Sequence, residues 1–187
     1  MEGIIELVDK ARKIEKTTEK EYRKGMKKLK EPEYADIKNL FLRIAIDTIL
    51  HKNVMDALKK SYAEALELIE EFEGEEIVNS AVLIPGVPMI VMPMGFGKMD
   101  EKIPPIEILE EYFKGFPETV VIPEEKLKEI RELLKKYLEL EEEMARIYDK
   151  LGRKVSHPIV KQLIDSISNN EKQHIALLKK LFEKYKE

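Results

Sequence analysis

Four long stretches of this chain place apolar residues at every third or fourth position, and short links join the stretches in two pairs. Such spacing predicts amphipathic helices. Helices joined by only a few residues must lie antiparallel to each other. The sequence therefore predicts two helical hairpins, over about residues 4–73 and 124–186. Their expected helices cover about residues 4–29, 34–72, 124–151 and 156–186.

Proline and glycine mark the expected helix ends. Pro32 disfavours helix in the residue before it, so the first helix should end near Lys30. Gly74 and Gly152 are suitable stops for the second and third helices. Pro158 fits the first turn of the fourth helix, because a helix needs no backbone donor there.

The connection between the hairpins, residues 75–123, differs in composition, since it contains seven of the nine prolines. Residues 82–92 could form a strand–turn–strand and residues 106–114 a short helix. A structureless connection of this length is uncommon, so we expect order. The apolar run over 77–92 is too short and too interrupted to span a membrane. We expect it to be buried on the bundle or in a subunit contact, as a packing flap or, alternatively, a substrate lid or partner module.

Each predicted helix carries a polar or ionisable side chain at a position of its seam that is otherwise apolar. In the third helix, for example, the register of Leu127 and Leu134 continues with Glu141. A carboxylate in an apolar interior is unfavourable unless a cation or a hydrogen-bonded partner accompanies it. The side chains of this kind are Glu15, Tyr22, His51, Glu141, Tyr148, Glu171 and His174.

These side chains also occur at matching levels. Glu15 and His51 lie at similar distances from the first hairpin turn, and Glu141 and Glu171 lie at similar distances from the second. A pair of divalent metal ions is the simplest positive charge that would bring these carboxylates and histidines together. Taken singly, each has another interpretation: a hydrogen-bonded core histidine, a glutamate reaching solvent or a lysine, or a tyrosine that only packs.

Composition limits the other classes of function. The chain has no cysteine, which excludes disulfides, thiolate zinc sites and iron–sulfur clusters. A net charge of −4 and a pI near 5.7 give no basic surface for nucleic acid. Abundant Lys and Glu without Cys or Trp is typical of thermophile proteins. No signal peptide or membrane span is evident, so we expect a cytoplasmic protein.

The step from Glu171 to His174 resembles the Glu-x-x-His element of di-iron carboxylate bundles. The N-terminal half repeats the C-terminal half, because the spacing of Glu15 to Tyr22 equals that of Glu141 to Tyr148. The chain is thus similar to the rubrerythrin-type members of the ferritin-like superfamily. That resemblance implies an all-α, ferritin-like four-helix bundle in which residues 75–123 form the long crossover.

The resemblance also implies a set of ligands. Glu15 and Glu141 would be terminal carboxylates, His51 and His174 the histidine ligands, and Glu171 a bridging carboxylate. Thr48 occupies the position where a second bridging glutamate is expected. Without it we expect an asymmetric site, with the better-occupied ion at Glu141, Glu171 and His174. Candidates for a substitute oxygen ligand are Asp47, Glu19, Glu142 and Glu143.

Histidine and carboxylate ligands suit iron, manganese or zinc, and the resemblance favours iron, at one or two ions per chain. It implies a redox centre acting on peroxide, oxygen or iron, with Tyr22, Tyr148 and Thr48 beside the ligands. Such an oxidoreductase would need an external electron donor, because the chain lacks a cysteine-ligated iron domain. The rival hypothesis is a bundle without metal that acts as a dimerisation or interaction scaffold. In both cases we expect a homodimer.

Overall fold

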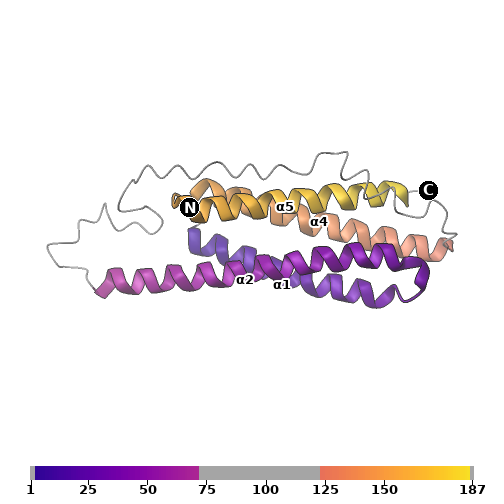
Figure 1. Ribbon diagram of the computed structural model, residues 1–187, viewed down its shortest axis with the longest axis horizontal. Helices are drawn as coiled ribbons and strands as arrows, with labels where there is room; N and C mark the ends of the chain where they lie inside the picture. Colours follow the sequence, from indigo (N-terminus) through magenta and orange to yellow (C-terminus); the bar gives the residue numbers. More distant parts are fainter. Residues whose placement is uncertain (1–2, 72–122, 186–187) are drawn as a thin grey trace.

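The computed structural model describes residues 3–71 and 123–185, and in these two ranges every regular element is helical (Figure 1). The helices form two hairpins that lie alongside each other, as the sequence predicts. A short 3-10 helix, Pro32–Tyr34, forms the turn of the first hairpin. The four long helices are α1 (Ile4–Lys28), α2 (Ala35–Glu71), α4 (Glu124–Lys154) and α5 (Pro158–Lys184).

The observed ends agree with the expected ones to within a residue or two, except at the end of α4. Gly152 was expected to stop this helix, but α4 continues to Lys154. A Cβ atom at Gly152 would lie 2.8 Å from Oδ1 of Asp165 on α5. The glycine therefore permits a close approach of two helices and does not end one. Gly74, the strand–turn–strand over 82–92 and the short helix over 106–114 lie outside the described residues.

The core is divided along the bundle axis into two apolar clusters. One surrounds Tyr22, Phe41 and Tyr137, near the turn of the first hairpin. The other surrounds Met55 and Tyr148, towards the opposite end of the bundle. The ionisable seam residues of all four helices lie in the layer between these clusters, and Tyr22 and Tyr148 border it. Among the described helices, none is long and apolar enough to cross a membrane.

Candidate metal centre

Five ionisable side chains are buried together in this middle layer. Their ligand atoms form two groups, and within each group the atoms lie within 4.8 Å of one another. Glu171 belongs to both groups. All five side chains are no more than 3% exposed: Glu15, His51, Glu141, Glu171 and His174.

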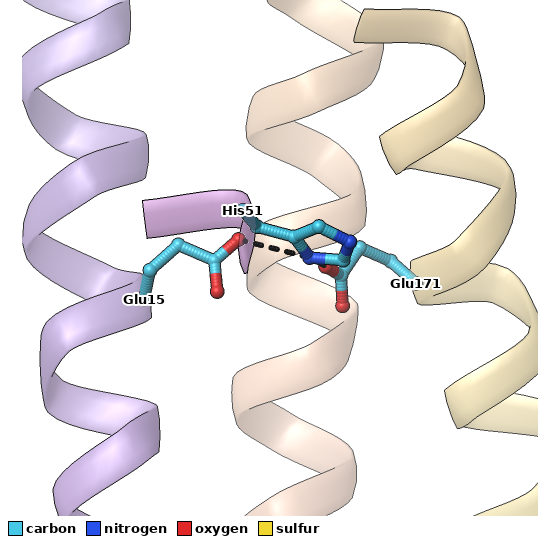
Figure 2. Close-up of side chains that lie close together, drawn as sticks. All are labelled: Glu15, His51 and Glu171. Carbon is cyan, nitrogen blue, oxygen red and sulfur yellow. Dashed lines mark ion pairs between the residues drawn. The ribbon is translucent and has the colours of Figure 1, made fainter. Parts of the chain in front are cut away.

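The first group joins three helices, because Glu15 comes from α1, His51 from α2 and Glu171 from α5 (Figure 2). Nδ1 of His51 lies 2.6 Å from Oε1 of Glu171 and 3.5 Å from Oε1 of Glu15. Neither approach has the direction that a hydrogen bond needs. Nδ1 of His51, Oε1 of Glu171 and Oε2 of Glu15 are buried and find no hydrogen-bond partner among the described residues.

The second group is more completely hydrogen-bonded. Nδ1 of His174 lies 3.1 Å from Oε2 of Glu141 and 3.4 Å from Oε2 of Glu171. The other ring nitrogen, Nε2, lies 3.1 Å from Oδ2 of Asp47 on α2. A carboxylate on the outer nitrogen is the arrangement that fixes the tautomer of a metal-binding histidine, with its inner nitrogen directed at the metal.

Two tyrosines connect the halves of the bundle through the glutamates. The hydroxyl of Tyr22 on α1 donates to Oε1 of Glu141 on α4, at 2.7 Å. In the reciprocal contact, the hydroxyl of Tyr148 on α4 donates to Oε1 of Glu15 on α1, at 2.6 Å. Each tyrosine holds one carboxylate oxygen and leaves the other directed into the layer. The repeat seen in the sequence is thus an approximate twofold relation in the structure.

Burial and mutual repulsion make two of the carboxylates weak acids. Burial raises the pKa of Glu15 to about 7, and the nearby Glu171 adds to the shift. Burial and the charge of Glu171 raise the pKa of Glu141 to about 8. Burial also acts on Glu171, but its contacts with His174 and His51 hold its pKa well below the usual range. Glu171 is therefore the carboxylate that stays ionised at neutral pH.

Burial acts in the opposite sense on the pKa values of the two histidines, but it does not decide them. Burial alone would lower the pKa of His51, but the carboxylates of Glu15 and Glu171 raise it to about 9. At His174, burial again lowers the pKa, but the carboxylates of Glu141 and Asp47 outweigh it and raise the pKa well above its usual value. In the metal-free protein two imidazolium ions thus supply the positive charge that the carboxylates require.

The structure separates the candidate substitute ligands from the two groups. Asp47 contacts the outer nitrogen of His174 and is a member of neither group. Glu19 pairs with Lys52 at 2.6 Å, and Glu142 pairs with Lys179 at 3.2 Å. Glu143 lines a groove between α1 and α4. In the part of the chain that the structure describes, none of these four carboxylates joins either group.

Thr48 lies in the layer but supplies no charge. Its side chain is fully buried, and its hydroxyl donates to the backbone carbonyl of Ile44 at 2.9 Å. The interpretation of the sequence missed Thr18, whose buried hydroxyl oxygen has no partner among the described residues and lies one turn from Glu15. It also missed the contact from Asp47 to His174, because it considered Asp47 only as a substitute metal ligand.

Comparison with protein-family models, with curated proteins and with solved structures found no match. What the centre does is therefore inferred from its own geometry.

Proposed function

We propose that the chain is a ferritin-like protein that binds transition-metal ions in the layer between its two apolar clusters. The observation that carries this proposal is the set of buried ligand atoms at Glu15, His51 and Glu171 that make no hydrogen bond among the described residues. A buried polar atom without a hydrogen bond costs roughly 1–3 kcal/mol, and the 2.6 Å ion pair between His51 and Glu171 offsets only part of that cost. One divalent cation would satisfy all three atoms at once, because each is a lone-pair donor.

The donor set narrows the choice of ion. Imidazole nitrogen and carboxylate oxygen without thiolate suit iron, manganese or zinc. Each group offers three residues, which leaves open coordination positions of the kind found in catalytic sites. We infer that the first ion is held by Glu15, His51 and Glu171, where buried atoms lack hydrogen bonds. The sequence alone favoured the group of Glu141, Glu171 and His174, which the structure shows largely satisfied by hydrogen bonds.

A redox-active ion there would supply electron transfer and Lewis acidity towards peroxide, oxygen or ferrous iron, as in a rubrerythrin-type oxidoreductase. The residues of the chain have defined tasks around it. Asp47 fixes the tautomer and orientation of His174. Tyr22 and Tyr148 hold one oxygen each of Glu141 and Glu15. The two apolar clusters exclude water from both ends of the layer. The electrons would come from an external donor.

Metal titration of the chelator-free protein tests the proposal. Binding of the first ion should release a proton, because the pKa of His51 is raised in the metal-free state and its Nδ1 must give up a proton to ligate the metal. Calorimetry with Mn²⁺ or Zn²⁺ in buffers of different ionisation enthalpy measures that release. The Glu171→Ala variant should bind no metal, because it removes the carboxylate common to both groups.

The matched control is Glu142→Ala, which removes an exposed carboxylate paired with Lys179. It should bind metal as the wild type does. If wild type and Glu171→Ala show the same weak binding without proton release, the metal centre is refuted.

The hydrogen-bonded second group favours one alternative. Because His174 already neutralises Glu141 and Glu171, the layer could be an ion network that stabilises a scaffold and never receives a metal. In that case metal ions would leave the thermal stability of the purified protein unchanged.

A further inference from the structure

Helix α2 is the longest of the described helices, and it carries an exposed apolar stripe in addition to the buried face that includes Thr48 and His51. Leu42, Ile46 and Leu50 follow one another at intervals of four residues and are 49%, 58% and 60% exposed. Large aliphatic side chains scattered singly on a surface need no explanation. Three in a row on one face of one helix indicate a contact surface.

The stripe has a symmetric sequence. Starting from Ile46, the same residue type occurs at equal distances in both directions: leucine at four residues, asparagine at seven and alanine at eleven. All seven residues are exposed in the structure. At 100° per residue they lie within about 40° of a single line along the helix and span roughly 33 Å. The set is Ala35, Asn39, Leu42, Ile46, Leu50, Asn53 and Ala57.

Both ends of the symmetric stripe are marked. Ala35 is the first residue of α2, and the 3-10 turn of the first hairpin lies directly before it. Beyond Ala57 the same face becomes charged, since Lys60 and Glu64 form an exposed ion pair at 3.6 Å. The seven-residue palindrome from Ala35 to Ala57 therefore contains only apolar and amide side chains, and the helix surface beyond it is charged and solvated.

We propose that the palindrome is a homodimer interface, in which α2 packs antiparallel against α2 of a second copy with the twofold axis at Ile46. A twofold contact requires a surface that is complementary to itself, and a palindrome on one helix face is such a surface for an antiparallel pair. Ile46 then meets its own copy, and Leu42 lies at the level of Leu50 of the partner subunit.

The asparagines give this pairing its register. In the antiparallel arrangement Asn39 lies at the level of Asn53 of the partner subunit, and the reverse holds on the other side of the axis. Two amide pairs flank the three apolar levels, and side-chain amides can both donate and accept a hydrogen bond. A shift of register would place amides against leucines and leave them without partners. The interface thus selects one alignment.

Cysteine cross-linking tests the axis directly, because the chain contains no cysteine of its own. Helices packed 8–10 Å apart bring Cα atoms that face each other across the axis to about 4–5 Å, within reach of a disulfide. The Ile46→Cys variant should form a disulfide dimer rapidly with oxidised glutathione. The control is Ile159→Cys on α5, which is 61% exposed in the same chain and should cross-link at least about tenfold more slowly. Equal rates for the two variants would overturn the proposal.

Sedimentation of the 187-residue chain provides an independent test with charged substitutions on the exposed stripe. Wild type should be a dimer at tens of micromolar, while Ile46→Glu and Ile46→Lys should each weaken association at least about a hundredfold by placing like charges at the axis. An equimolar mixture of the two variants should dimerise again, because opposite charges then meet there. A monomeric wild type, or a mixture that stays monomeric, would contradict the proposed axis. Circular dichroism should remain unchanged throughout.

Discussion

Thr48→Glu is the substitution that should separate a metal centre from an ion network most clearly. It places a carboxylate at the position that the internal repeat assigns to a second bridging glutamate, opposite Glu171. Thr48 is fully buried, so the new group would enter the layer without access to bulk water. The change removes only one hydrogen bond, from the threonine hydroxyl to the carbonyl of Ile44.

The effect on the metal-free protein follows from the glutamates already present. Burial raises the pKa of Glu15 to about 7 and that of Glu141 to about 8, against an ordinary value of 4.5. A third carboxylate in the layer should behave similarly and remain protonated near neutral pH, whereas it ionises in the unfolded chain. At about pH 7 that difference destabilises the fold by roughly 3 kcal/mol. Near pH 4.5 the penalty should almost vanish, because the unfolded chain is then partly protonated too.

Urea unfolding of the metal-free wild type, Thr48→Glu and the uncharged control Thr48→Gln measures this penalty at both pH values. With Mn²⁺ or Zn²⁺ present, Thr48→Glu should regain the lost stability, because the carboxylate becomes a ligand. Elemental analysis should then rise from about one towards two ions per chain, whereas the control should not change. If Thr48→Glu loses no stability at neutral pH and binds no additional metal, the layer is not the site we describe.

Three further outcomes are expected. The pKa of His51 is raised from 6.5 to about 9 in the folded, metal-free protein, so protonation of His51 stabilises the fold below pH 6.5. This contribution, roughly 3 kcal/mol, is lost as the pH rises to about 9, and the melting temperature should fall over the same range. Asp47→Asn should weaken binding of the second ion, at Glu141, Glu171 and His174, about 10–100-fold in calorimetry without unfolding the chain, because it removes the charge that orients His174. Gly25→Ala should lower the free energy of unfolding by about 1–3 kcal/mol, since its Cβ would lie 1.8 Å from the Tyr137 hydroxyl, and Tyr137→Phe should relieve part of that loss.

The helical fold of the described residues could be predicted because α1, α4 and α5 each follow a simple apolar periodicity with polar surfaces. The five side chains of the layer could be predicted for the same reason. A charged or imidazole side chain at an apolar register position, repeated on four helices, places them at one depth without knowledge of any contact. The pairing of hairpins also follows from the short links.

Contacts between helices were harder to predict, because they depend on rotation about each helix axis. Asp47 occupies a half-buried position of α2, and only the packing of α5 beside it brings His174 within reach. Gly152 shows the same limitation. A glycine near a helix end signals a stop in sequence, but here the close approach of α5 requires it inside the helix. The crossover over 75–123 lies largely outside the described residues, and the expected subunit contact there remains a prediction.

Anomalous diffraction from crystals of the metal-loaded protein tests the central claim most directly. Data collected on both sides of the manganese or iron absorption edge locate the ion independently of the protein density. We predict an anomalous peak about 2.0–2.2 Å from the carboxylate of Glu171 and from Nδ1 of His51, with any second ion beside Glu141 and His174. Ordered crystals without a peak in the layer, or with peaks only at surface carboxylates, would contradict the account.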